Sequence, residues 1–196
     1  MIQARGLGRR FGEKRVLSGL DLEVGAGEFL LVTGPNGSGK TTLLRLLAGL
    51  IVLTAGELDV DLDRARIGFL GHEPLLYREL TPVENLDLYG RLYRIPERRE
   101  RIGMLLERFG LWDARREQTG DLSRGMLQRL ALCRTLLHEP ELLLLDEPFS
   151  SLDAAGGALL LDELERRDAH RTVVLASHQP ERLGDRPTAH LSLVPA

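Results

Sequence analysis

Residues 34–42 constrain this chain more than any other segment. They read Gly-Pro-Asn-Gly-Ser-Gly-Lys-Thr-Thr and fit the phosphate-binding pattern G-x-x-x-x-G-K-[ST]. The apolar run at 29–32 predicts a buried strand before the loop. The periodic run at 43–48, closed by Gly49, predicts a helix after it. Strand, glycine loop and helix in this order indicate a phosphate site rather than an ordinary turn.

Each residue type in this loop has a use in binding a nucleoside triphosphate. Glycine lets backbone N–H groups turn toward phosphate oxygens, and the following helix presents the positive end of its dipole. We expect Lys40 to reach the β- and γ-phosphates and the Thr41 hydroxyl to hold Mg²⁺. The other residues expected to form the cradle are Asn36, Gly37, Ser38, Gly39 and Thr42.

Two adjacent acids follow a run of four leucines at 142–145, which predicts a buried parallel strand. Ligands of doubly wound sheets bind outside the carboxyl ends of the strands. We expect Asp146 to hold Mg²⁺ through water beside Thr41, and Glu147 to orient or deprotonate an attacking water. Two acids at a strand end also occur where a chain simply enters a solvated turn, and the glycine loop favours the functional interpretation.

Composition limits the classes of partner. The length of 196 residues predicts one domain, or a core with a subdomain, and the net charge of -3 gives no basic field for nucleic acid. The single cysteine, Cys133, lies in an apolar helical pattern and predicts a reduced core thiol in a cytosolic setting. Residues 43–53 are too short for a membrane span, and the N-terminus lacks the pattern of a signal peptide, so we expect a soluble chain.

The remaining pattern predicts an α/β chain with inserted helices. Residues 2–32, 58–62 and 67–70 predict strands, and we expect Asp59, Asp61 and Asp63 to lie on a solvated face. A helix from 154 to Arg167 and a strand at 172–176 complete an α/β repeat.

Between residues 80 and 137 the periodicity is helical. Thr81, Pro82 and Glu84 form a capping box, a second helix ends at Gly110, and a third begins at Ser123. These helices suggest a helical lobe on an α/β core, with Trp112 inside the core of that lobe.

Further motifs resemble those of the ATP-binding subunits of ABC transporters, over essentially the whole length. Residues 122–126, Leu-Ser-Arg-Gly-Met, look like the family signature Leu-Ser-Gly-Gly-Gln, and the familiar Gln128 and Arg129 follow. Residues 150–153, Ser-Ser-Leu-Asp, resemble the D-loop, and His178 resembles the switch histidine. Phe11, with Val16 after it, occupies the place of the aromatic residue that stacks on adenine.

The resemblance implies a fold and an activity. The fold is a P-loop NTPase (RecA-like) α/β core with an N-terminal antiparallel β subdomain and an inserted α-helical subdomain. Residues 1–196 form a single nucleotide-binding domain, with the core and β subdomain at about 1–74 and 138–196 and the helices at about 75–137. The implied activity is ATP hydrolysis coupled to transmembrane transport, with ATP and Mg²⁺ as cofactors. The implied catalytic residues are Lys40, Glu147 and His178.

The resemblance also implies partners. Ser123, as an N-cap, and Gly125, with a free N–H, form an anion site that faces the γ-phosphate held by a second copy, and Asp153 of the D-loop joins the nucleotide contacts. The expected partners are that second nucleotide-binding subunit and a transmembrane subunit docked on the helical subdomain through an exposed groove beside His72. The expected location is peripheral, on the cytoplasmic face of the cell membrane.

Three residues depart from the family pattern. Arg124 replaces a glycine of the signature, and we expect it to point to solvent; Met126 replaces the glutamine. His72 stands where a glutamine normally reaches Mg²⁺, which prefers oxygen ligands to neutral imidazole. We therefore expect His72 to contact the nucleotide site but to act mainly in coupling to the membrane partner.

Several functions remain open from the sequence. Residues 70–74 and 79–86 are similar to the ATP-binding subunit of the haem exporter of cytochrome c biogenesis. The alternative is the ATPase of another small exporter, for a drug, lipid or peptide. A P-loop kinase would leave the signature and His178 unexplained. A soluble ABC-type protein acting on ribosomes or DNA generally has two cassettes or a coiled coil, and Glu147 argues against a non-catalytic scaffold.

Overall fold

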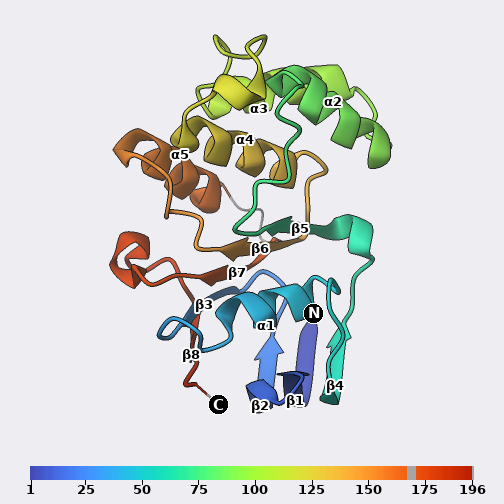
Figure 1. Ribbon diagram of the computed structural model, residues 1–196, viewed down its shortest axis with the longest axis vertical. Coiled ribbons are helices and arrows are strands. Elements are labelled where there is room, and N and C mark those ends of the chain that lie inside the picture. Colours follow the sequence, from blue (N-terminus) through green and yellow to red (C-terminus); the bar gives the residue numbers. More distant parts are fainter. Residues whose placement is uncertain (167–170, 196) are drawn as a thin grey trace.

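The computed structural model describes residues 1–166 and 171–195, which form two β-sheets and a set of helices (Figure 1). The antiparallel sheet has the order β2-β1-β4 and consists of β1 (Ile2–Phe11), β2 (Lys14–Val24) and β4 (Ala55–Val60). The second sheet has the order β5-β6-β7-β3-β8, and all its pairings are parallel. Its strands are β3 (Phe29–Thr33), β5 (Ile67–Leu70), β6 (Leu142–Asp146), β7 (Thr172–Ala176) and β8 (Ala189–Ser192).

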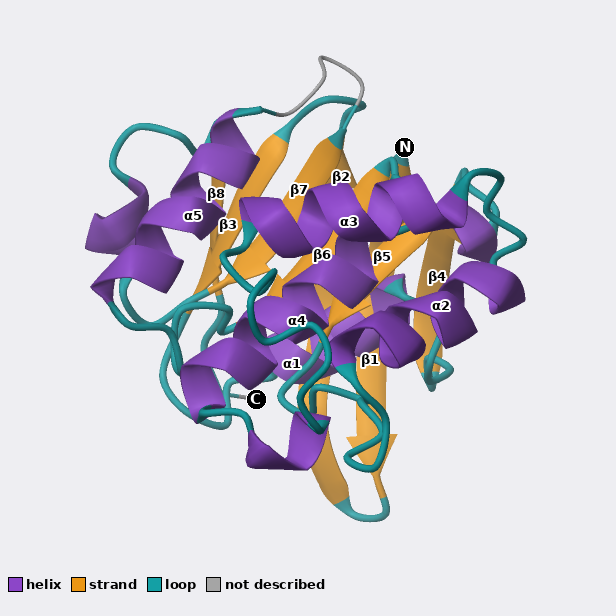
Figure 2. Cartoon of the chain, turned by 90° about the horizontal axis from the view of Figure 1, so that it is seen from above, coloured by secondary structure: helices purple, strands orange, loops and turns teal. Residues whose placement is uncertain are grey.

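The helices lie on both faces of the parallel sheet. The α-helices are α1 (Lys40–Leu47), α2 (Pro82–Leu92), α3 (Arg98–Arg108), α4 (Arg124–Leu136) and α5 (Ala154–Glu165). Short 3₁₀ turns cover Arg64–Arg66, Thr119–Asp121 and Pro180–Leu183. In Figure 1, α1 and the antiparallel sheet lie below the parallel sheet, whereas α4 and α5 lie above it, with α2 and α3 outermost. Figure 2, seen from above, shows α2, α3 and α4 stacked over the strands.

Alternation along each central strand divides the core in two. Phe29 and Leu31 of β3 point into one apolar cluster with α2–α5, while Leu30 and Val32 point into another with α1 and the antiparallel sheet. Strands β6 and β7 follow the same rule, because successive side chains leave a strand on opposite faces. This burial on both faces explains why the sequence of β6 is a continuous apolar run.

The helix boundaries follow local capping chemistry. The Thr81 side chain accepts from Glu84 N, the Glu84 side chain accepts from Thr81 N, and Pro82 begins α2, so the predicted capping box is confirmed. Gly110 follows the end of α3 and has a left-handed conformation (φ 63°). Glycine is common at this position after a helix, which agrees with the predicted end of the helix at Gly110. Helix α4 begins after Ser123, whose hydroxyl accepts from Met126 N.

Most elements predicted from the sequence are present, and the α/β fold with an N-terminal antiparallel sheet and inserted helices is confirmed. The acids Asp59, Asp61 and Asp63 are exposed, as expected. Helix α5 ends at Glu165, and Arg167, given as its predicted end, lies outside the described residues. The edge strand β8 was not predicted as an element.

The prediction for Trp112 was wrong. Its side chain is 40% exposed, and the Arg115 guanidinium lies 4.1 Å from the ring centroid. The core of the helical layer (α2, α3 and α4) is filled instead by Leu105, Leu106 and Phe109, which have no exposed surface. Trp112 lies in a short loop after α3, above this core. The apolar periodicity of a helix does not predict burial in such a loop.

The helical layer is not packed as a separate body. Its buried residues share one apolar cluster with the upper face of the parallel sheet, including Leu143, Leu145 and Val173. The division at residues 74/75 and 137/138 therefore stays a proposal about subdomains. Across residues 1–166 and 171–195, no helix combines the length and apolar character needed to cross a membrane.

Asn85 joins three segments of the helical layer although its side chain is fully buried. Its Oδ1 accepts from Tyr77 N at 2.8 Å. Its Nδ2 donates to Tyr77 O at 2.9 Å and to the Thr119 hydroxyl at 3.0 Å. These bonds hold the segments that contain Tyr77 and Thr119 against α2. Because a buried amide without partners is costly, breaking the bonds would destabilise this layer.

We predict that Asn85→Ala lowers the free energy of unfolding by about 2–3 kcal/mol, because Tyr77 N and Thr119 lose buried partners. Urea titration followed by circular dichroism measures the change. Gln118→Ala, which removes an exposed amide from the same region, is the control and should change the value by less than about 0.5 kcal/mol. Equal effects of the two substitutions would contradict the role of Asn85.

Cys133 supplies a second test of the core. Its thiol is buried in α4, and burial raises the pKa of this thiol far above its usual range. We predict that Ellman's reagent at pH 8 reacts with the folded protein only at the rate at which the chain opens. Addition of denaturing urea should expose one thiol per chain. Rapid reaction in the absence of urea would contradict the burial of this helix face.

Candidate functional site

Three strand ends meet at one edge of the parallel sheet. In the register, Asp146 at the end of β6 pairs with Ala176 at the end of β7, and Ala176 pairs with Val32 of β3. The residues that follow these strands are therefore brought together although they are far apart in the sequence. They are the glycine loop at 34–39, Glu147, and the segment that contains His178.

Two glycines of the loop lie where no side chain fits. A Cβ on Gly34 would be 2.4 Å from Leu193 O, and one on Gly39 would be 2.7 Å from the Leu17 side chain. Both have positive φ, at 144° and 101°. Gly37 also has positive φ, at 83°, but a Cβ there would meet open space. The first two glycines thus shape the turn, and Gly37 leaves room beside the loop.

A cavity of about 320 Å³ lies against this loop. Its lining includes most of the residues predicted from the sequence: Val16, Asn36, Gly37, Gly39, Lys40, Thr41, Thr42, Asp146 and Glu147. Lys14 also lines the cavity, although no sequence motif points to it. The signal available was that Lys14 is one of only two lysines and follows the turn at Gly12, which directs β2 back past the loop.

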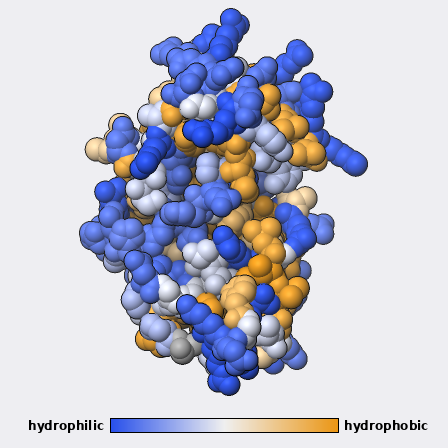
Figure 3. Space-filling model, viewed as in Figure 1, coloured by the Kyte–Doolittle hydropathy of each residue, from blue (hydrophilic) through white to orange (hydrophobic). Residues whose placement is uncertain are grey.

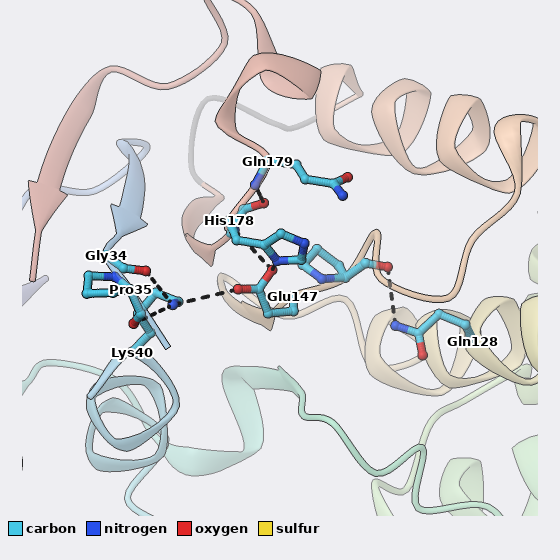
Figure 4. A network of polar contacts seen from close by, with 9 residues as sticks. Gly34, Pro35, Lys40, Gln128, Glu147, His178 and Gln179 are labelled. Atoms are coloured by element: carbon cyan, nitrogen blue, oxygen red, sulfur yellow. Dashed lines mark hydrogen bonds and ion pairs between the residues drawn. The ribbon is translucent and has the colours of Figure 1, made fainter. Parts of the chain in front are cut away.

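Lys40 is held by backbone carbonyls and by an acid (Figure 4). Its Nζ donates to Gly34 O at 2.7 Å and to Pro35 O at 3.3 Å, and it lies 3.9 Å from Glu147 Oε1. The Lys40 side chain is only 8% exposed, so its charge requires these partners. The ammonium group therefore lies between the loop that would hold phosphate and the acid at the end of β6.

Glu147 joins Lys40 to His178. Its Oε2 accepts from His178 N at 3.1 Å and lies 2.6 Å from His178 Nδ1, so Nδ1 carries the hydrogen of this contact when the imidazole is neutral. Glu147 has a left-handed backbone (φ 49°), which is unfavourable outside glycine, and its N–H donates to Ala176 O at 2.9 Å. This bond holds the acid in place at the strand end.

A carboxylate oxygen of Asp146 supports the expected binding of a metal ion by Asp146 and Thr41. Burial raises the pKa of Asp146, and a hydrogen bond from the Thr41 side chain opposes that rise. Asp146 Oδ1 is buried and has no hydrogen-bond partner within the described part of the chain. The hydroxyl of Ser38 is buried and unpaired there in the same way. These atoms suit a Mg²⁺ ion and a phosphate, because Mg²⁺ binds through one or two protein oxygens together with substrate phosphate.

His72 and Phe11 lie outside the lining of this cavity. His72 is exposed in the loop after β5 and does not bond to any cavity residue in the described part of the chain. Phe11, at the end of β1, is 48% exposed, with the Arg9 guanidinium 4.4 Å from its ring centroid. A base that stacks on this ring would therefore extend beyond the cavity.

The signature and D-loop residues form a second group that does not line the cavity. Ser123 and Gly125 lie at the start of α4, and a Cβ on Gly125 would come within 3.4 Å of Ser151 O. Asp153 is the N-cap of α5 and accepts from Gly156 N at 2.8 Å. Arg124 is exposed, as predicted, and Gln128 Nε2 donates to Pro148 O at 3.2 Å, which ties α4 to the segment after Glu147.

Known proteins resemble this chain in sequence and fold. The sequence model of the ABC transporter family matches residues 17–150. The daunorubicin resistance ATP-binding protein DrrA3 of Streptomyces coeruleorubidus is 40% identical over 100% of this chain and 65% of its own length. The macrolide export ATP-binding/permease protein MacB 1/2 of Paracoccus denitrificans is 36% identical over 92% of this chain and 30% of its own. The chain thus spans less than two thirds of either relative.

A solved structure agrees with these matches. It is described as the dimeric, post-hydrolysis state of the ATP-binding cassette MJ0796 bound to ADP and Pi, and it is 29% identical to this chain with a TM-score of 0.85. The likeness covers 98% of this chain and 94% of that one. Because the family match includes the glycine loop and both acids, this chain belongs to the ABC transporter family and is one of its ATP-binding ATPase domains.

Proposed function

We propose that this chain hydrolyses ATP as a nucleotide-binding subunit of an ABC exporter, in a cycle in which two copies close on ATP and separate after hydrolysis. The observation that carries the proposal is the contact chain from Lys40 through Glu147 to His178 at the phosphate loop. It places an acid, an ammonium group and an imidazole at the edge of the sheet where the cavity opens.

The chemistry assigned to these residues is in-line attack of water on the γ-phosphorus, which gives ADP and phosphate. Glu147 orients the water and accepts its proton, because its carboxylate is the base adjacent to the loop. Lys40 exchanges its carbonyl partners for phosphate oxygens and stabilises the charge that spreads over them. His178 positions Glu147 through Nδ1, which leaves its Nε2 to face the nucleotide.

Mg²⁺ fits the two oxygen donors at the foot of the loop. We assign Thr41 Oγ1 and, through water, Asp146 to the ion, in agreement with the unpaired buried oxygen of Asp146. When bound, the ion neutralises charge on the β- and γ-phosphates. The backbone of Asn36 to Thr42 surrounds the phosphates, and Val16 and Phe11 contact the base.

The second copy completes the nucleotide site. Ser123, Gly125 and Asp153 do not line this chain's cavity, yet the first two lie at the start of α4, where N–H groups favour an anion. We assign them to the γ-phosphate held by the partner copy. The similar solved cassette is dimeric, which supports a dimer of this chain. A γ-phosphate shared by two copies would then hold them together until it is cleaved.

The proposal for the transported compound rests on the relatives of this chain. The names of both relatives given above refer to drug resistance or macrolide export, so we propose a small amphipathic drug-like compound, moved by a transmembrane subunit at the cytoplasmic face of the membrane. Haem export in cytochrome c biogenesis is the second candidate. It is supported by the resemblance of residues 70–74 and 79–86, but neither relative is named for it.

We predict that Glu147→Gln lowers kcat for ATP hydrolysis by at least about 100-fold, because the amide cannot accept the proton of the attacking water. ATP binding should persist, and ATP should shift the variant from monomer to dimer in size-exclusion chromatography with light scattering. Ser123→Ala in the same background is the control for the interface and should weaken the dimer without weakening ATP binding.

Two results would contradict this function. One is a Glu147→Gln variant that stays monomeric and free of nucleotide in saturating Mg-ATP. The other is transfer of phosphate to an added nucleoside or metabolite instead of release as free phosphate, which would indicate a kinase.

We predict a smaller effect at His72. His72→Ala should keep most of the Mg²⁺-dependent ATPase activity of the isolated chain, because imidazole is a poor ligand for Mg²⁺ and water can complete the coordination. His72→Gln should behave similarly, whereas Asp146→Ala should abolish activity. Phosphate release across a Mg²⁺ titration measures all three. A loss in His72→Ala as large as that in Asp146→Ala would show that His72 serves the metal site directly.

A further inference from the structure

A second cavity, of about 590 Å³, opens on the outer side of the helical layer. It lies between α2, α3 and the loop that follows α3, and it shares no lining residue with the nucleotide cavity. In Figure 1, α4 and the parallel sheet lie between these helices and the nucleotide loop. We call it the arginine–tryptophan pocket, after the residues Arg99, Trp112, Arg115 and Arg116 in its wall.

The floor of this pocket is apolar and preformed. Ile102 and Leu106 of α3 lie beneath it with almost no exposed surface, at 3% and 0%, so the apolar surface open to a ligand comes from the half-buried Val83 and from Trp112. Trp112 forms one side, with its ring near Gly103, where a Cβ would lie 3.7 Å from the indole. Arg115 fixes this wall, because its guanidinium stacks on Trp112 and its Nη1 donates to Trp112 O at 2.7 Å. The Trp112 side of the pocket is therefore held in place by Arg115.

The acids in the pocket already have partners. Asp87 Oδ1 and Oδ2 accept from Arg98 Nε at 2.6 Å and Arg91 Nε at 2.7 Å. Glu84 is occupied by the capping box, where its Oε2 accepts from the backbone and hydroxyl of Thr81 at 2.8 Å. Both pairs hold the pKa of these two carboxyls below the usual range. The charge of Asp87 is thus matched by two arginines, whereas Glu84, whose partners are neutral, remains one negative charge on the α2 side of the pocket.

The arginines of the pocket lack acidic partners. Arg99 and Arg116 are exposed, and within residues 1–166 and 171–195 neither they nor Arg115 form an ion pair with an acid. Figure 3 shows a mainly hydrophilic surface at this end of the molecule, with small apolar areas beside it. With three arginines against the one unmatched acid Glu84, the wall of this pocket carries net positive charge in a chain whose net charge is -3. Its chemistry complements carboxylates that flank an apolar group.

We propose that the arginine–tryptophan pocket docks an acidic segment of a partner protein, with an aromatic or aliphatic side chain between its carboxylates. The apolar side chain packs on Val83 and Trp112, while the carboxylates bind Arg99 and Arg116. Arg recognises carboxylates through two parallel N–H donors, and Trp and Arg are the residues most often central to binding energy. The proposal does not rest on the nucleotide site, so ATP hydrolysis can fail or succeed independently.

The test uses the peptide acetyl-Glu-Glu-Phe-Leu-Glu-Glu-amide, with Gln-for-Glu and Gly-Gly-for-Phe-Leu versions as comparisons. Trp112 is the only tryptophan of the chain, so its fluorescence reports on this pocket alone. Saturable quenching or enhancement is expected with the first peptide, with at least 10-fold weaker binding of either comparison peptide. Binding should also weaken between 0.05 M and 0.3 M salt, because the contacts are charged and near the surface.

Variants separate this pocket from general charge effects. Arg99→Glu with Arg116→Glu should weaken binding at least 10-fold, whereas Arg5→Glu with Arg10→Glu, which alters two exposed arginines of β1, should leave it unchanged. Gly103→Leu should block the pocket, whereas Gly103→Ala makes only ordinary contact with Trp112 and should bind normally. Circular dichroism confirms that each variant is folded.

Three outcomes would overturn the proposal. One is the absence of any saturable fluorescence change with the acidic peptide. Another is equal binding of the peptide that lacks Phe-Leu, which would reduce the pocket to a general anion site. The third is binding to phosphatidylserine vesicles through Arg99 and Arg116 with no binding to the peptide, which would assign the surface to a membrane.

Discussion

The register of three neighbouring strands determines how the glycine loop, the two acids and the segment of His178 meet at the nucleotide site. Asp146 of β6 lies opposite Ala176 of β7, and Ala176 lies opposite Val32 of β3, so three loops leave the sheet at the same edge. A shift of one residue in β6 would exchange its two apolar faces and move both acids away from the glycine loop. Since each face of these strands is buried under a different apolar cluster, the packing that stabilises the fold also fixes the catalytic geometry.

The charged groups at that edge have partners within the protein. Lys40 is nearly buried and obtains its partners from two loop carbonyls and Glu147, while Glu147 has a second partner in His178. A buried charge without partners would cost several kcal/mol, about 3–5 for a broken buried pair. Phosphate oxygens can replace the carbonyls around Lys40 without leaving either charge alone. The partners of Lys40 within the protein are thus of the same chemical kind as the phosphate oxygens expected there.

Sequence alone predicts the parts of this structure that depend on local chemistry. The glycine loop, the capping box at Thr81 and the apolar run before Asp146 each follow from residues close together in the chain. Tertiary placement was harder to predict. Trp112 follows the end of α3 and is exposed, and Lys14 lines the cavity only because the hairpin between β1 and β2 returns beside the loop. The positions of Trp112 and Lys14 depend on tertiary contacts, which the local pattern of apolar residues does not predict.

The loop after α3 connects the arginine–tryptophan pocket to the start of α4, where Ser123 lies. It begins with Trp112 and Arg115 at the arginine–tryptophan pocket, where Arg115 O accepts from Val83 N at 3.4 Å. It continues to Thr119, whose N–H donates to Leu80 O and whose hydroxyl is bonded by Asn85, and it ends at Ser123. A partner in the pocket would therefore contact the same ordered loop that positions the signature serine. A ligand shifts a conformational equilibrium only by the difference between its affinities for the two states. Binding in the pocket is therefore coupled to the position of Ser123 only if the partner binds two arrangements of this loop with different affinity.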